Sequence, residues 1–338
     1  MHAENPPRTP EPLVDNRYCL QTRVHALNGY IPVPGDRRIF IKREDELSSG
    51  ISGSKYRKFA SLIPWLAAEK PDEVLLIGSD QSNNITGLLQ ALNETRIQAR
   101  LMLLRGHDEE HRGNSLWLAM LCPVDDIIWI ERDEWPQVEE QANKYASGEA
   151  LTGKKVIVIP EGSAHVRALP GAMTLAEDIL RNESEMNLHF DHIFIDSGTG
   201  LSAAGMIIGV AALGFGRHNI HITLIAGEET YFREKLEFYS LEAAKVLQRS
   251  PDLSTIELHF YKPVIAPSFG ACPPSVLKEI KVIARETGIL MEPIYSVKHL
   301  MTVRSVIENK GLTGNILFIN SGGSFALSGW QEKLAKLV

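Results

Sequence analysis

The stretch HIFIDSGTGLSAAG, residues 192–205, decides the fold class of this chain. Its first four residues form a short apolar run, and a loop of small and polar residues then leads into an apolar helical run that begins near Ala203. A strand that is apolar on both faces is typical of a buried parallel sheet. Ligands bind beyond the carboxyl ends of such strands, so the loop at 196–202 is the first candidate for a functional site.

The same alternation of apolar runs and helical patterns continues along most of the chain. We predict further strands at residues 74–77, 99–104, 156–159, 220–226 and 315–319. Helical patterns lie at residues 84–92, 276–286 and 297–308, and a charged amphipathic helix with a solvated face is predicted at 231–248. Strands that alternate with helices of this size predict βαβ units and an α/β fold with an open doubly wound sheet.

Composition excludes several classes of protein. The 338 residues carry 35 Lys and Arg against 42 Asp and Glu, which gives a formal net charge of −7. Hydrophobic residues make up 44% and charged residues 23%, as in an ordinary globular protein. Because the charge balance is acidic, the chain has no excess of basic residues to bind the phosphate backbone of a nucleic acid. We therefore expect no nucleic-acid partner.

The cysteines and the apolar segments indicate in which cellular compartment the protein is expected. Cys19, Cys122 and Cys272 are far apart in sequence, which favours a reducing cytoplasm over a disulfide framework or a zinc site. The proline-rich stretch at 1–12 lacks the pattern of a secretory signal. The longest apolar stretch, 203–215, is too short and too interrupted by glycine to span a bilayer. We therefore expect a cytoplasmic enzyme without a membrane partner.

Loops rich in small and polar residues follow three of the predicted strands, at 78–84, 196–202 and 320–324. In the second loop, Gly198 and Gly200 would let the backbone approach a phosphate, and the amides at the start of the next helix would point toward it. Thr199 and Ser202 would add hydroxyl donors. The sequence therefore predicts an anion-binding loop.

Two other interpretations of that loop stay open. One is a tight turn whose small residues serve packing alone. The other is the dinucleotide variant G-x-G-x-x-A, formed by Gly198, Gly200 and Ala203, with Glu228 after the next strand as the acid that binds a ribose.

A basic segment, SGSKYRK at 52–58, follows KRED at 42–45. By itself this segment indicates a basic turn before a helix, with its charges facing solvent. It is not a P-loop, because it has no Gly-Lys run followed by Ser or Thr.

The segment HDEEH at 107–111 matches the H-x-x-E-H pattern of inverted zincins. Zincins place this pattern inside a long helix, whereas Gly106 and Gly113 bracket it here. We interpret it as a charged surface turn and predict no metal site.

Taken in chain order, these segments resemble the fold-type II pyridoxal-phosphate enzymes related to 1-aminocyclopropane-1-carboxylate deaminase and D-cysteine desulfhydrase. The two basic segments are similar to the family pattern KRED…GGNKxRK. The remaining matches are QSN at 81–83, GTGLSAAG at 198–205 for GSGGTxAG, GILMEPIYSVK at 288–298 for EGxxxDPVYxGK, and SGG at 321–323 for TGG. The resemblance runs from about residue 41 to residue 327 and covers most of the chain.

The resemblance implies a set of residues that bind pyridoxal 5′-phosphate. Lys55 would form the Schiff base with the cofactor aldehyde, because a primary amine is needed for that condensation. Lys58, one helical turn further on, would reach the phosphate as a point charge. Asn83 would bind the ring hydroxyl, and Ser321 would partner the pyridine nitrogen. The phosphate itself would be held by Gly198, Thr199, Gly200, Leu201 and Ser202.

The resemblance also implies catalytic roles for Lys55, Ser82 and Tyr295. Ser82 would face the substrate as a carboxylate-binding hydroxyl or a proton carrier, although a serine there also fits simple helix capping. Tyr295 would act as an acid or base near the substrate, which requires its environment to tune a phenol that ordinarily titrates near pH 10. An amphipathic core tyrosine is the alternative for this position.

The chain departs from the family pattern at four positions. Ser54 stands where asparagine precedes the lysine, and Leu201 replaces a loop glycine. Phe269, before Gly270, takes the place of a second active-site tyrosine. Ser296 replaces the glutamate of the deaminases, and this loss argues against cyclopropane ring opening.

The resemblance sharpens the fold class to an α/β protein with two open doubly wound, mostly parallel sheets, similar to the β subunit of tryptophan synthase. A larger cofactor domain, residues 1–69 plus 166–338, would carry a smaller inserted domain at 70–165, with the cofactor between them. The expected function is a lyase or deaminase that eliminates a β-substituent from a small amino acid and gives a 2-oxo acid and ammonia. A homodimer is expected. The alternatives are a nicotinamide-dependent oxidoreductase that uses Gly198 to Glu228, and a cofactor-binding homologue without catalysis.

Overall fold

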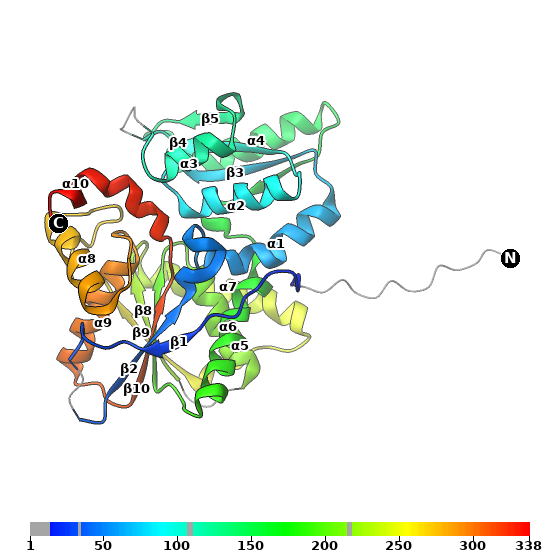
Figure 1. Cartoon of the computed structure of the whole chain (residues 1–338). Helices are drawn as coiled ribbons and strands as arrows, with labels where there is room; N and C mark the ends of the chain where they lie inside the picture. The colour runs from blue at the N-terminus through cyan, green and yellow to red at the C-terminus, as the bar shows by residue number, and fades with distance from the viewer. Residues whose placement is uncertain (1–13, 33–34, 107–110, 215–217) are drawn as a thin grey trace.

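The fold contains two sheets (Figure 1), and the computed structural model describes residues 14–32, 35–106, 111–214 and 218–338. The six-stranded sheet has the order β1 (Val24–Ala26), β2 (Arg38–Arg43), β10 (Asn315–Asn320), β7 (His192–Ser197), β8 (His218–Leu224), β9 (Ile256–Tyr261). The four-stranded sheet has the order β5 (Ile127–Ile130), β4 (Ala99–Leu104), β3 (Glu73–Ser79), β6 (Val156–Ile159). All pairs are parallel except β1 with β2. The predicted fold class of two mostly parallel sheets is confirmed.

The helices that surround these sheets are α1 (Lys55–Glu69), α2 (Asn83–Glu94), α3 (Asn114–Leu121), α4 (Val138–Ala150), α5 (Leu169–Met186), α6 (Leu201–Leu213), α7 (Glu229–Leu247), α8 (Pro274–Thr287), α9 (Ser296–Lys310) and α10 (Gln331–Ala335). Each helix predicted from the sequence is present. The helix expected at 231–248 is α7, and it is amphipathic as predicted, with Phe232, Leu236 and Tyr239 buried on its inner face.

Every strand predicted from the sequence is also present, but one prediction was too long. The strand expected at 220–226 ends at Leu224. The amides of Ile225 and Ala226 both donate to the carbonyl oxygen of Ser197, which ends β7, so the chain turns across the sheet edge there. Strands β1, β2, β5 and β9 escaped prediction. Of these, β1, β5 and β9 lie at sheet edges, where their residues are mostly half-buried, whereas β2 is an internal strand with four buried residues.

The larger sheet is covered on both faces, which explains its apolar strands. On β7, Ile193 and Ile195 belong to a core that includes residues of α5 and α6. Phe194 points to the opposite face and packs in a second core with residues of α8 and α9. Because successive side chains on a strand face opposite sides, a strand covered on both faces is apolar at most of its successive positions.

In sequence, the smaller sheet and its helices lie between the two segments that form the larger sheet. In the view of Figure 1, they lie above the larger sheet. The strands of the smaller sheet fall between Glu73 and Ile159. All four therefore lie within the predicted insertion at 70–165, and we propose that this insertion is the smaller domain. Helix α1 joins the two parts, because it packs against both α2 and α5.

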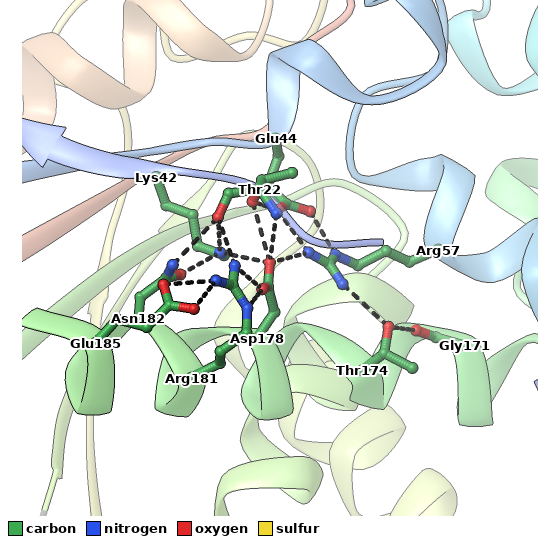
Figure 2. Close-up of polar contacts among 10 residues, drawn as sticks. All are labelled: Thr22, Lys42, Glu44, Arg57, Gly171, Thr174, Asp178, Arg181, Asn182 and Glu185. Atoms are coloured by element: carbon green, nitrogen blue, oxygen red, sulfur yellow. Dashed lines mark hydrogen bonds and ion pairs between the residues drawn. The ribbon is translucent and has the colours of Figure 1, made fainter. Parts of the chain in front are cut away.

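A buried ionic network holds α1 against the larger sheet (Figure 2). The guanidinium of Arg57 on α1 donates to Glu44 Oε2 at 2.6 Å and to Asp178 Oδ2 at 2.8 Å. Asp178, on α5, also accepts from Lys42 Nζ on β2 at 2.6 Å. Arg57 is 1% exposed and Lys58 3% exposed, so the prediction of a solvated basic face at 52–58 was wrong. Charges removed from water are stable only when they are paired, and this pairing fixes the start of α1.

Candidate active site

A cavity of about 420 Å³ lies where the carboxyl ends of β3, β7 and β10 meet. The sequence-predicted site residues that line it are Lys55, Lys58, Ser82, Asn83, Gly198, Thr199, Gly200, Ser202, Tyr295 and Ser321. The exception is Leu201, whose side chain is fully buried in the core beneath the loop. Tertiary structure thus gathers residues that are almost 270 positions apart in sequence into one site.

Lys55 is placed by a close approach of two backbone segments. Gly53 has φ +55°, and a Cβ there would lie 2.0 Å from the carbonyl oxygen of Ser321, so only glycine fits. The next amide, of Ser54, donates to that same oxygen at 2.8 Å. The turn before α1 is therefore fastened to the end of β10, which places Lys55 and Ser321 on the same cavity.

The amine of Lys55 is held in a desolvated environment. Burial lowers the pKa of Lys55, and the nearby carboxylates of Asp196 and Glu292 partly oppose that effect. Its Nζ lies 5.2 Å from the centroid of the Tyr295 ring. A lysine with a lowered pKa has a larger fraction of neutral, nucleophilic amine near pH 7.

Lys58 lies one helical turn further along α1 and lines the same cavity as the glycine loop at 198–202. Its Nζ donates to the carbonyl oxygen of Gly162 at 2.9 Å. Burial, assisted by repulsion from Lys55, lowers the pKa of Lys58 to about 7. Gly162 has φ +66°, and a Cβ there would lie 2.5 Å from Thr199 Oγ1, so Lys58 and the loop converge on one edge of the cavity.

The loop after β7 has the geometry of an anion cradle. Gly200 adopts φ +95° immediately before α6, which begins at Leu201. The first amides of a helix have no partner within it, and they point out of its amino end with a partial positive charge. Thr199 and Ser202 line the same part of the cavity. This backbone and the ammonium of Lys58 together fit a phosphate group.

Asn83 and its neighbours form the opposite wall. Asn83 Oδ1 accepts a hydrogen bond of 2.6 Å from Asn114 Nδ2, so its amide nitrogen faces Gly323 and the cavity. Ser82 lines the cavity and also caps α2, because its hydroxyl accepts from the amide of Ile85 at 3.3 Å. The two interpretations of Ser82 are therefore compatible. Sequence reasoning missed Asn114, which no recognisable motif surrounds.

Tyr295 lies at the start of α9 and packs closely against the loop. A Cβ on Gly198 would lie 3.2 Å from the Tyr295 hydroxyl. Burial and the neighbouring carboxylates, first Glu292 and then Asp196, raise the pKa of Tyr295 above its ordinary value, so the phenol keeps its proton. Phe269 makes an edge-to-face contact with Tyr295 at 5.9 Å between centroids, and it is 58% exposed. Tyr295 is thus a protonated phenol with an apolar neighbour.

Glu292 has a structural task at this end of α9. Its carboxylate accepts hydrogen bonds from the amides of Ile294, Tyr295 and Ser296 at 2.6–2.8 Å. Ser296 is 1% exposed and lies outside the cavity lining, and its hydroxyl donates to the carbonyl oxygen of Gly322 at 3.4 Å. The serine that replaces the deaminase glutamate is therefore part of the scaffold.

The dinucleotide interpretation of the loop finds no support in this geometry. Glu228 lies outside the cavity lining, with 74% of its side chain exposed. It forms an ion pair of 2.7 Å with Lys262. The cavity beside the loop instead holds the two amines of Lys55 and Lys58.

No cluster of three or more potential metal ligands occurs within the described part of the chain. Most of the segment at 107–111 lies outside the described residues. Over the ranges that the structure covers, none of the helices is both long enough and apolar enough for a membrane span.

Comparison with known proteins finds relatives that match most of the chain. No family model matches the chain. A putative 1-aminocyclopropane-1-carboxylate deaminase of Pyrococcus furiosus is 26% identical over 305 residues, or 88% of each chain. The mitochondrial bifunctional D-cysteine desulfhydrase/1-aminocyclopropane-1-carboxylate deaminase of Arabidopsis thaliana is 27% identical over 335 residues, which cover 94% of this chain and 80% of that protein.

The solved structures agree about the fold. The crystal structure of a homologue of 1-aminocyclopropane-1-carboxylate deaminase has a TM-score of 0.79, with 24% identity and 96% coverage of each chain. A fungal L-serine ammonia-lyase from Rhizomucor miehei has a TM-score of 0.60 at 14% identity and covers 93% of this chain and 98% of its own. The fold is that of the fold-type II pyridoxal-phosphate enzymes. Over most of its length the chain is similar in sequence to proteins named 1-aminocyclopropane-1-carboxylate deaminase and D-cysteine desulfhydrase.

Proposed function

We propose that this chain is a pyridoxal-phosphate-dependent lyase that eliminates a β-substituent from a small amino acid and releases a 2-oxo acid and ammonia. The observation that carries the proposal is the convergence of Lys55 and Lys58, one helical turn apart on α1, with the glycine loop at 198–202 in one cavity. An amine with a lowered pKa beside an anion cradle is the arrangement that an aldehyde bearing a phosphate requires.

The donors around the cavity fit pyridoxal 5′-phosphate. The backbone of the loop and the ammonium of Lys58 would hold the phosphate, and Lys55 would bind the aldehyde carbon. The amide nitrogen of Asn83 would donate to the ring oxygen, and the hydroxyl of Ser321 would partner the ring nitrogen. When bound, the cofactor withdraws electrons from Cα of an amino acid and so makes loss of a nearby proton feasible.

The remaining residues support a division of labour on the substrate. The Ser82 hydroxyl would bind the substrate carboxylate. The neutral amine of Lys55 would take up a proton, and the phenol of Tyr295, which keeps its proton, would donate one to the leaving group. Phe269 would shield the mouth of the cavity from water.

The departures at 269 and 296 favour β-elimination over ring opening. The residue after Tyr295 is a scaffold serine here, so no carboxylate enters the cavity from that position. We therefore propose an amino acid with a β-leaving group as the substrate, as for the relatives named D-cysteine desulfhydrase.

The test is a substrate panel on the purified chain loaded with pyridoxal 5′-phosphate. D- and L-cysteine, D- and L-β-chloroalanine and 1-aminocyclopropane-1-carboxylate would be scored for release of 2-oxo acid and ammonia. We expect release from a β-substituted substrate and no release by Lys55→Ala. If the chain binds the cofactor but turns over none of these compounds, it is a cofactor-binding homologue without catalysis. That result would overturn the proposal.

We also propose that the enzyme is a homodimer of the cytoplasm. The family resemblance supports the dimer. Cys19, Cys122 and Cys272 are all free thiols, as expected in a reducing compartment. Light scattering coupled to gel filtration measures the mass in solution, and a single species near 37.6 kDa would contradict the dimer.

A further inference from the structure

A buried carboxylate without an assigned role lines the cavity. Asp196, near the end of β7, is 8% exposed. Its Oδ1 atom is buried and has no hydrogen-bond partner. Buried polar atoms in folded proteins are nearly always paired, so an unpaired carboxylate oxygen at a binding cavity points to a functional task.

The other carboxylates of the cavity lining differ from Asp196. Glu292 is also buried, but three backbone amides occupy its two oxygens. Glu161 is exposed to solvent. Among the lining residues that the structure describes, Asp196 is the buried carboxylate that has an oxygen without a hydrogen-bond partner.

A buried histidine interacts electrostatically with Asp196. His299 is fully buried on α9, one turn after Tyr295, whose carbonyl oxygen accepts from the His299 amide at 2.9 Å. Its Nδ1 lies 2.8 Å from Thr223 Oγ1, and the strand register places Thr223 beside Asp196. The Nε2 atom of His299 has no partner. Two unpaired polar atoms thus belong to neighbouring residues.

Asn320 completes this buried polar cluster. It is 1% exposed, and neither polar atom of its side chain has a partner. Phe318 pairs with Phe194 in the register of β10 with β7, so two residues further on Asn320 reaches the level of Asp196. The His299 ring packs on Phe318 with 4.9 Å between centroids.

The charged and titratable groups that face Asp196 come from two helices. Lys55 and Lys58 on α1, and Tyr295 and His299 on α9, all interact electrostatically with its carboxylate. Burial lowers the pKa of His299 to about 4, so its imidazole is neutral at physiological pH. The neutral ring therefore acts on Asp196 as a dipole and not as a charge.

We propose that Asp196 is a proton-transfer residue of this active site and that His299, held by Thr223, is its positioning residue. The proposal rests on the proposed lyase activity. In the transfer, an N–H bond of the Lys55 ammonium breaks with its electron pair left on nitrogen, and an O–H bond forms at Asp196 Oδ1. An ammonium and a carboxylate become an amine and a carboxylic acid, and the reverse transfer restores both. Asp196 would thereby supply the carboxylate that Ser296 does not.

The test compares Asp196→Asn with the matched surface variant Asp133→Asn, which removes the same charge from an exposed position. With the β-substituted substrate that the wild-type chain turns over best, we expect Asp196→Asn to lower kcat by about 10²- to 10⁴-fold. KM and the Kd for pyridoxal 5′-phosphate should change by less than a few fold. Formate should restore part of the activity to Asp196→Ala. A kcat for Asp196→Asn within threefold of wild type would overturn the proposal.

The positioning role of His299 has its own readout. His299→Leu removes the polar ring, so kcat should fall while KM and the Kd for pyridoxal 5′-phosphate change by less than a few fold. His299→Gln keeps an amide donor and should restore part of kcat. Equal kcat values for the three proteins would overturn this role.

A measurement on the cofactor-free chain separates failure of this inference from failure of the proposed function. Asp196 raises the pKa of His299, so Asp196→Asn should lower the midpoint of the His299 imidazole titration followed by ¹⁵N NMR. An unchanged midpoint would contradict the electrostatic interaction between the two residues. A wild-type chain that shows this coupling but turns over no substrate would instead contradict the proposed function.

Discussion

Asn114 Nδ2 donates a 2.6 Å hydrogen bond to Asn83 Oδ1 and a second, of 2.8 Å, to the carbonyl oxygen of Gln81. These two bonds fix the Asn83 side chain with its NH₂ group toward the cavity. Asn114 is 1% exposed and belongs to α3, whereas Asn83 begins α2. Helix α3 therefore orients a side chain on α2 that we propose to bind the cofactor.

The first prediction concerns Asn114. Asn114→Leu removes both bonds and leaves Asn83 free to rotate, so the affinity for pyridoxal 5′-phosphate should fall by about tenfold. Fluorescence titration of the cofactor-free chain measures this. Asn143→Leu, at an exposed position of α4, is the control and should leave the Kd unchanged. An equal loss in both variants would contradict the orienting role.

A second prediction follows from the packing of Gly162 on Thr199. Gly162→Ala would place a Cβ 2.5 Å from Thr199 Oγ1 and so displace the loop at 198–202. Gly153→Ala is the matched control, because Gly153 also has positive φ, +90°, but has nothing within 4 Å. We expect Gly162→Ala to weaken binding of pyridoxal 5′-phosphate at least tenfold more than Gly153→Ala does. Pyridoxal, which has no phosphate, should bind both variants similarly.

Lys58 gives a pH-dependent prediction for the stability of the cofactor-free chain. Its pKa is about 7 in the folded chain and has the ordinary value of 10.5 when solvated. Between these values the unfolded chain binds a proton that the folded chain does not, so the free energy of unfolding rises with pH by up to about 1.4 kcal/mol per pH unit. Lys58→Met keeps the volume and removes this contribution. Urea unfolding of both proteins from pH 7 to 9 should show the smaller slope for Lys58→Met.

The same variant should bind the cofactor poorly. A bound phosphate dianion favours the charged form of Lys58, so the ammonium would contribute to affinity that methionine cannot replace. We expect the Kd for pyridoxal 5′-phosphate to rise about 10- to 100-fold, and calorimetry measures it. A Kd equal to that of the wild-type chain would mean that the phosphate does not contact Lys58.

The buried ionic network gives a stability prediction. Glu44→Gln leaves the guanidinium of Arg57 without one of its two buried carboxylates (Figure 2). We expect a loss of about 3–5 kcal/mol in the free energy of unfolding. Glu131→Gln breaks an exposed ion pair with Arg105 and should cost less than about 1 kcal/mol. Comparable losses in the two variants would show that burial does not control the cost.

Much of the candidate site was within reach of sequence reasoning, because the residues that bind small groups lie in short local motifs. The glycine loop and the lysine pair at positions 55 and 58 are examples. Asn114, Asp196 and His299 were not found, since their importance arises from contacts between elements that are distant in sequence. The interpretation of residues 52–58 as a solvated basic turn was wrong for a related reason. The carboxylates of Glu44 and Asp178, which pair with the buried Arg57, come from other segments of the chain.

The sequence by itself determined most of the elements, because buried strands are apolar on both faces and small residues follow them where the backbone turns. It also determined which side chains are available for chemistry, such as the primary amine of Lys55. Only the tertiary structure decided the pKa values and the hydrogen-bond partners of these side chains. Burial lowers the pKa of Lys55 and raises that of Tyr295, and it leaves one oxygen of Asp196 unpaired. Desolvation depends on what packs around a group, and that packing is a property of the whole fold.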